Sequence, residues 1–148
     1  MSDQLLQRVL VPVASIHDAK ATCDALIPYC SAGGTEIIAV HVIEKAGGSL
    51  DKASVEQREL ETEEMFDVIR EHLGELDIEL LTEIRFGTSV AHAVVETAHE
   101  MNVSSIAFTP RGGSKWVKLL AGDVTTELIN ESDVPIVVLP DQPDDTQS

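Results

Sequence analysis

The chain is poor in aromatic residues and in cations. It has one Trp, one Tyr and three Phe in 148 residues, and 10 Lys and Arg against 26 Asp and Glu, which gives a net charge of −16. So acidic a surface repels phosphate backbones and anionic lipid, so neither nucleic acid nor a membrane is expected as a partner. No run of about 18 apolar residues occurs, and the polar start Met1-Ser2-Asp3-Gln4 has no signal-peptide core. We therefore expect a cytoplasmic protein.

The scarcity of lysine indicates that the protein works in concentrated salt. Only five lysines are present, and carboxylates are spread along every amphipathic segment. This composition resembles that of proteins from halophiles, in which concentrated salt screens the repulsion among surface carboxylates. An ordinary acidic cytoplasmic protein is the alternative interpretation.

Residues that commonly carry catalysis or bind metals are few and scattered. Cys23 and Cys30 lie seven residues apart on a predicted helix, about 10 Å along its axis, which is too far for an unstrained disulfide. Both are expected to be small buried side chains. His92 and His99 are also seven apart, wider than the spacing of a helical metal pair. His41 is expected to be a hydrogen-bonded core histidine. The sequence predicts no catalytic set, and an enzyme is not expected.

The rest of the pattern alternates short apolar strands with amphipathic helices. This alternation predicts a parallel sheet covered by helices on both faces, in one domain over residues 1–140. Strands are expected at 8–13, 35–43, 78–85, 103–109 and 134–139, and helices at 18–31, 51–76, near 90–101 and at 123–130. The alternating strand at 78–85 is expected at an edge of the sheet. The acidic tail, 141–148, is expected to be disordered.

One loop stands out by its charge. Between Met101 and Gly122 there are three cations (Arg111, Lys115 and Lys118) and no carboxylate, although a window of this size should hold about four acids. A local positive field on so negative a chain indicates an anionic ligand. A solvated loop with a chance charge bias is the alternative.

The same loop resembles the motif of the universal stress protein family: Gly, two residues, Gly, nine residues, Gly, then Ser or Thr. Gly112 and Gly122 keep the spacing, whereas Thr109 and Asp123 replace the first glycine and the Ser or Thr. Similar segments occur at 9–13, 41–42, 86–89 and 132–139. The resemblance implies a single doubly wound five-stranded parallel sheet, Rossmann-like or adenine nucleotide alpha hydrolase-like, of order 3-2-1-4-5. Ligands of such sheets bind where the strand order reverses, here between the first and fourth strands.

The resemblance also implies which residues would contact ATP or AMP. They are Pro12, Val13, Ala14, Val42, Thr109, Arg111, Gly112, Gly113, Gly122, Asp123 and Val124. Nucleotide-binding relatives carry an Asp after the first strand, where this chain has Ala14. Asp123 can cap the following helix, but it cannot donate to phosphate. At 4 Å it would repel a phosphate charge by roughly 4 kcal/mol for an effective dielectric of 20. A bridging Mg²⁺ would reverse that sign, with Asp123 as its ligand.

The sequence is compatible with two main functions. The two replaced motif positions, Thr109 and Asp123, favour a stress-response regulatory or binding module that acts on unidentified protein partners without nucleotide. The kept glycine spacing favours an ATP- or AMP-binding switch that uses Mg²⁺. A slow ATPase ranks last, because no residue is a candidate for positioning water. The resemblance further implies a homodimer through the fifth strand. Its contacts would be Pro135, Ile136, Val137, Val138 and Leu139, an apolar edge that needs covering.

Overall fold

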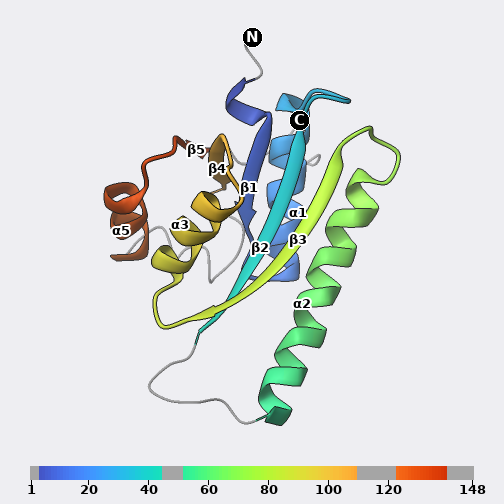
Figure 1. Cartoon of the computed structure of the whole chain (residues 1–148). Helices are drawn as coiled ribbons and strands as arrows, with labels where there is room; N and C mark the ends of the chain where they lie inside the picture. Colours follow the sequence, from blue (N-terminus) through green and yellow to red (C-terminus); the bar gives the residue numbers. More distant parts are fainter. Residues whose placement is uncertain (1–3, 45–51, 110–122, 140–148) are drawn as a thin grey trace, which may run out of the picture.

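The described part of the chain folds around one parallel sheet. A computed structural model describes residues 4–44, 52–109 and 123–139. The strands are β1 (Arg8–Pro12), β2 (Glu36–Glu44), β3 (Glu79–Gly87), β4 (Ser105–Phe108) and β5 (Ile136–Val138). They pair in parallel in the order β3-β2-β1-β4-β5 (Figure 1). This confirms the predicted fold class and strand order.

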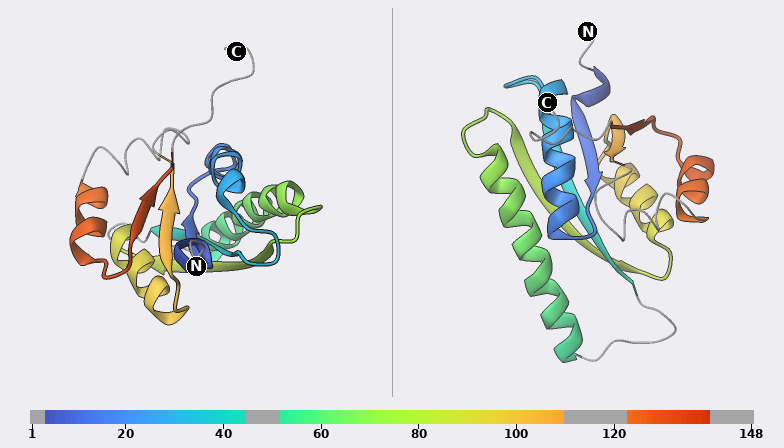
Figure 2. Two further views of the ribbon diagram at one scale, coloured as in Figure 1. Left: turned by 90° about the horizontal axis from the view of Figure 1, so that it is seen from above. Right: turned by 180° about the vertical axis from the view of Figure 1, so that it is seen from behind.

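Helices cover both faces of the sheet (Figure 2). The helices α1 (Ile16–Leu26) and α2 (Lys52–Leu73) pack on one face, and α3 (Val90–Glu100) and α5 (Asp123–Glu131) pack on the other. Two short 3₁₀ turns, η1 (Gln4–Leu6) and η2 (Ile27–Tyr29), complete the described elements. Successive strand residues point to opposite faces, so Val9 and Val11 join the α1 and α2 side while Leu10 joins the α3 side.

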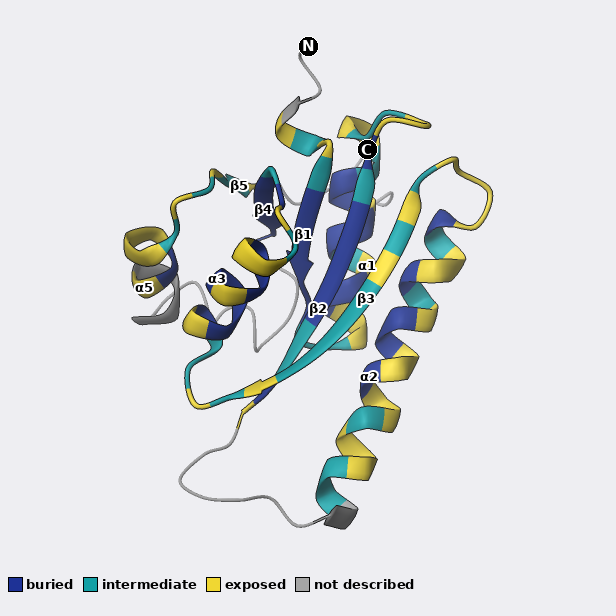
Figure 3. Cartoon of the chain, viewed as in Figure 1, coloured by how far each residue is buried: buried dark blue, intermediate teal, exposed yellow. Residues whose placement is uncertain are grey.

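Burial distinguishes the central strands from the edge strand. Most side chains of β1 and β2 are buried, whereas those of β3 are half-buried or exposed (Figure 3). On β3, Leu80 and Ile84 pack against the core, while Leu81 is 36 % exposed. The alternation that predicted an edge strand is therefore confirmed, because only one face of β3 is covered.

The first helix differs from its predicted bounds at both ends. It begins at Ile16, two residues before the predicted start at Asp18, because the Ser15 side chain caps it by accepting from the Asp18 N–H at 3.1 Å. It ends at Leu26, five residues before the predicted end. Pro28 lacks the N–H that would continue the α-helical ladder, so the chain turns into η2.

The second helix is shorter than predicted. It spans Lys52–Leu73 and stops before Gly74, which is a poor helix residue. Its predicted core residues Met65, Phe66, Ile69 and Leu73 are buried. The other two predicted members of that stripe are not: Val55 is half-buried and Leu76, beyond the helix, is 41 % exposed. No helix in the described ranges combines the length and the apolar character that crossing a membrane requires.

The last strand is shorter than the predicted 134–139. It covers only Ile136–Val138. Pro135 has no N–H to donate, yet its carbonyl accepts from the Ile106 N–H at 2.9 Å. The Leu139 N–H donates to the Phe108 carbonyl at 2.8 Å, so the flanking residues still align β5 on β4. The expected tail at 141–148 lies outside the described residues.

Candidate ligand site at the carboxyl edge of β1 and β4

The strand order reverses between β1 and β4. Moving outward from β1, the sheet continues through β2 and β3 on one side and through β4 and β5 on the other. The helix that follows β1, α1, packs on one face of the sheet, whereas α5, the next described element after β4, packs on the other. Open parallel sheets bind ligands in the crevice formed there, so the predicted site residues are placed relative to this edge.

On the β2 side of this edge, the backbone of Val13 is already hydrogen-bonded. Its N–H donates to the Val40 carbonyl at 2.9 Å, and its carbonyl accepts from His41 Nδ1 at 2.7 Å. Because a carbonyl can only accept, Nδ1 carries the proton. His41 is thus a hydrogen-bonded histidine, as predicted, although it is half-buried rather than fully buried. A ligand could reach Val13 only through the second lone pair of its carbonyl.

The other predicted residues of β1 and β2 lie at the same edge. Pro12 is the last residue of β1 and aligns with Val40. Ala14 follows it and packs, partly buried, with the cluster on the α3 side. Val42 lies on β2 opposite Arg85 and joins the same cluster. These positions give this edge of the sheet apolar side chains, which suit a flat apolar ring better than a charged group.

Thr109 follows β4, where the family motif has its first glycine. Its side chain is 0 % exposed and its Oγ1 lies 3.3 Å from Oγ1 of Thr22 on α1, which is also buried. Glycine at this position would leave the space between the end of β4 and α1 free. In this chain a threonine side chain fills that space and links β4 to α1.

Removing one hydroxyl of this pair should cost more than removing both. Thr22→Val leaves the buried Thr109 hydroxyl without this partner, so we expect it to lower the free energy of unfolding by about 1 kcal/mol. The double variant, which also carries Thr109→Val, should be no less stable than either single variant. Urea unfolding of the two single variants and the double variant gives the coupling. Additive losses would show that the two hydroxyls do not interact.

Sequence reasoning missed one residue of this edge, Asp18. It is 0 % exposed and lies in the first turn of α1, one turn before Thr22 on the same face. Ala14 leaves the position after β1 without a carboxylate, yet a carboxylate stands four residues later. A signal was present: Ser15 and Asp18 have the Ser-x-x-Asp spacing of a capped helix start, which sets the helix to begin at Ile16.

Most residues of the predicted ligand-binding loop lie outside the described part of the chain. Arg111, Gly112, Gly113 and Gly122 lie outside the described residues, as do Lys115, Trp116 and Lys118. Asp123 and Val124 are the first two residues of α5, but their side chains are outside the described part. The Mg²⁺ ligation expected of Asp123 thus stays a prediction. In residues 4–44, 52–109 and 123–139, no three His, Cys, Asp or Glu side chains gather as metal ligands would.

Neither cysteine is a reactive thiol. Burial raises the pKa of the Cys23 thiol to about 12 and also raises that of Cys30, so both stay protonated at neutral pH. Cys23 is buried as predicted, whereas Cys30 is half-buried and its Sγ donates to the Leu26 carbonyl at 3.5 Å. Both are free thiols, as the sequence spacing predicted.

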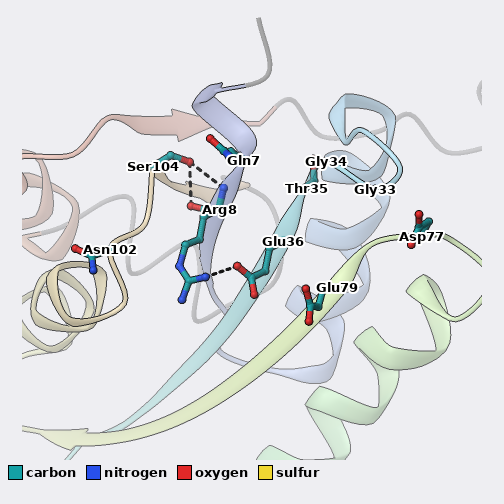
Figure 4. A pocket seen from close by; sticks show the side chains of 10 residues that line it. All are labelled: Gln7, Arg8, Gly33, Gly34, Thr35, Glu36, Asp77, Glu79, Asn102 and Ser104. Carbon is teal, nitrogen blue, oxygen red and sulfur yellow. Dashed lines mark hydrogen bonds and ion pairs between the residues drawn. The ribbon is translucent and has the colours of Figure 1, made fainter. Parts of the chain in front are cut away.

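A cavity of about 560 Å³ opens at the opposite, amino edge of the sheet (Figure 4). Arg8, Glu36, Asp77 and Glu79 are among its lining residues. The Arg8 guanidinium is paired with Glu36 and also donates from Nε to the Met101 carbonyl at 2.6 Å. Arg8, the cation among these lining residues, is therefore already paired. Asp77 and Glu79 would repel a phosphate. The cavity is lined by carboxylates rather than by free cations, and it lies at the edge of the sheet opposite to the predicted anion site.

The predicted dimer residues lie in and beside β5, the outermost strand next to β4. Ile136, Val137 and Val138 form β5, and Pro135 and Leu139 flank it. Leu139 is buried, Ile136 and Val137 are half-buried and Val138 is 56 % exposed. β5 is the last strand on its side of the sheet, so its outer edge is free for pairing within the described chain.

Comparison with known proteins identifies the family to which this sequence is similar. The model of the universal stress protein family matches residues 6–140, which is most of the chain. No curated protein matches it. Solved structures with the same fold include the hypothetical protein PH0823, with 19 % identity over 95 % of this chain and 99 % of that one and a TM-score of 0.74.

Two further solved structures extend the comparison. One is a universal stress family protein from Burkholderia pseudomallei, with 16 % identity over 92 % of this chain and 97 % of that one and a TM-score of 0.68. The other is the universal stress protein from Archaeoglobus fulgidus in complex with dAMP, with 14 % identity over 91 % and 98 % and a TM-score of 0.59. At these identities the structures show a shared fold, and the family match covers the sequence. The chain belongs to the universal stress protein family.

Proposed function

We propose that this chain is a small dimeric stress-response module in the cytoplasm that acts on protein partners and does not need a bound nucleotide. The observation that carries the proposal is the side chain of Thr109. It is fully buried and 3.3 Å from Thr22, at the position where the family motif has a glycine. The Thr109 hydroxyl is turned towards Thr22, and Asp123 in place of Ser or Thr removes a hydroxyl donor, so fewer donors remain for phosphate. The proposal includes no catalytic step.

A second candidate function is an ATP- or AMP-binding switch that uses Mg²⁺. A relative with the same fold has been solved with dAMP, and this chain keeps the Gly112 to Gly122 spacing. In this case Asp123 would bind the metal ion, which would turn its repulsion of phosphate into attraction. The two candidates differ in one measurable property, the affinity for ATP with and without Mg²⁺.

The experiment is a search for bound nucleotide in the purified protein. The protein is prepared in high salt and denatured, and released nucleotides are identified by mass spectrometry. The emptied protein is then titrated with ATP, with and without Mg²⁺. We expect no stoichiometric nucleotide and no binding up to millimolar ATP. A stoichiometric nucleotide, or micromolar binding that requires Mg²⁺, would overturn the proposal in favour of the switch.

A further inference from the structure

The outer edge of β3 is a free edge of the sheet among the described strands. β3 ends the strand order on the side opposite to β5, and it pairs with β2 in an unbroken register over Glu79–Gly87. The strand contains no proline, and its register has no bulge. In an edge strand, alternate residues turn their N–H and C=O groups outward. β3 therefore offers a regular backbone template for one more strand.

One face of this edge carries carboxylates around a single apolar residue. Leu80 and Ile84 pack against the core on the side of α2. Side chains alternate along a strand, so Glu79, Leu81 and Glu83 point to the side of α3. Glu79 and Leu81 are exposed, and Glu83 is half-buried. This face thus presents a carboxylate, an apolar side chain and a second carboxylate at every second position.

The next residue on this face is a cation, Arg85, which is shared by two carboxylates. Its guanidinium donates to Glu83 Oε1 at 3.0 Å and to Glu100 Oε1 at 2.6 Å. One cation between two carboxylates leaves a net negative charge at this point. A basic group beside Glu83 would therefore still meet an acidic surface.

The cavity of about 560 Å³ at the amino edge of the sheet lies at the start of β3. Glu36, Asp77 and Glu79 are among its lining residues (Figure 4). Glu36 is paired with Arg8, whereas Asp77 and Glu79 have no cationic partner within the described ranges. The Gly33 N–H donates to the Asp77 carbonyl at 2.6 Å, which fixes one wall of the cavity. The cavity thus has room and charge for the end of a lysine or arginine side chain.

We propose that the outer edge of β3 binds an extended basic segment of a partner protein, which adds a strand to the sheet. Main-chain hydrogen bonds hold such a segment, and its alternate side chains give specificity. These are Lys or Arg beside Glu79, an apolar residue beside Leu81, and Lys or Arg beside Glu83. The first basic side chain enters the cavity. This order is the same in both directions, so it fits a parallel or an antiparallel segment.

Charge complementarity favours this occupant over others. The chain has a net charge of −16, which attracts a basic segment and repels an acidic one. A second copy of this chain would bring the same negative charge to the edge. The inference deepens the proposed function and rests on it, because it takes the partners of the module to be proteins.

The test uses a labelled peptide as the partner segment. It has nine residues, with Lys at the third and seventh positions, Leu at the fifth, and Thr or Val elsewhere. Its binding to the wild-type protein is followed by fluorescence anisotropy. The salt concentration is the lowest at which circular dichroism shows the intact fold, because salt screens exposed charges.

Two control peptides separate the parts of the interaction. One carries Glu in place of both Lys residues, and the other has an N-methylated backbone, which removes its N–H donors. We expect both controls to bind at least about tenfold more weakly than the first peptide. Equal binding of the N-methylated peptide would overturn the addition of a strand.

Matched protein variants test the place of binding. Glu79→Lys reverses a charge at the start of β3, and Glu127→Lys makes the same change at an exposed position of α5, which follows the other side of the sheet. Glu79→Lys should weaken peptide binding about tenfold, as expected when an attraction between charges about 5 Å apart in water becomes a repulsion. Glu127→Lys should bind the peptide like the wild type. Where Glu79→Lys does not fold, Glu79→Gln replaces it, with Glu127→Gln as its control and about a fourfold loss expected.

The outcomes separate this inference from the proposed function. Equal losses in the variants of Glu79 and Glu127 would show that net charge controls binding, and would overturn the role of β3. No binding of the peptide up to millimolar concentration would also overturn it. The same holds where light scattering shows assemblies larger than a dimer and the peptide does not bind, because a second copy then covers the edge. Tight ATP binding by the wild type overturns the proposed function, whereas the peptide titration decides the role of β3.

Discussion

Phe66→Ala should lower the free energy of unfolding by about 3–5 kcal/mol, since truncating a buried aromatic loses its transfer energy and leaves a cavity. Phe66 is 1 % exposed on the inner face of α2. It belongs to the core cluster that also holds Val11 and Val13, which lie at the carboxyl end of β1. The substitution therefore tests whether α2 docks on the face of the sheet that supports the candidate site.

The control for Phe66 is Leu60→Ala on the same helix. Leu60 is 64 % exposed, so its truncation should change the free energy of unfolding by no more than about 0.5 kcal/mol. Urea unfolding at constant salt, followed by circular dichroism, measures both variants. Similar losses for the two residues, or a loss below about 1 kcal/mol for Phe66, would contradict the docking of α2 described above.

The fold could be predicted because its signals are local or repeated. Apolar runs such as those of β1 and β2 indicate strands buried on both faces, and the weaker alternation of β3 indicates an edge. The order of the strands was not in these patterns. It came from the resemblance of a loop and four short segments to one family, which the match over residues 6–140 bears out.

The candidate site could be predicted only in part, because a shift of two residues changes the role of Asp18. A helix that began at Asp18 would make it an exposed cap. The observed start at Ile16 turns Asp18 into a member of the buried face. The helix starts at Ile16 because Ser15, and not a later residue, is its N-cap. Capping propensity does not predict this start, because Ser and Asp both cap helices well.

Side-chain contacts between segments that are distant in the chain could not be predicted from the sequence either. The bond from His41 to the Val13 carbonyl depends on the register of β1 against β2, and the contact of Thr22 with Thr109 depends on the tilt of α1 across the sheet. Each residue pair is separated by 28 or 87 positions, and no local pattern links them. The sequence predicts the edge at which we expect a ligand, and this stays a prediction, whereas the side-chain contacts at that edge emerge only from packing.

Val138→Pro should convert a dimer of about 32 kDa, twice the chain mass of 16.0 kDa, into a monomer. N–H groups alternate sides along a strand. The Leu139 N–H points to β4, where it meets the Phe108 carbonyl at 2.8 Å, so the Val138 N–H points to the free edge. Proline removes this outward donor and keeps the pairing with β4. Proline is tolerated on edge strands, so the fold of the monomer should survive.

The control for this prediction is Val138→Thr, which keeps both the backbone N–H and a β-branched side chain. Light scattering in high salt should give the dimer mass for the wild type and Val138→Thr and the monomer mass for Val138→Pro. Circular dichroism should be the same for all three. A wild type that is monomeric where the fold is intact would contradict dimerisation. A proline variant that stays dimeric would place the interface on a surface other than the edge of β5, because a strand pairing there needs the donor that proline lacks.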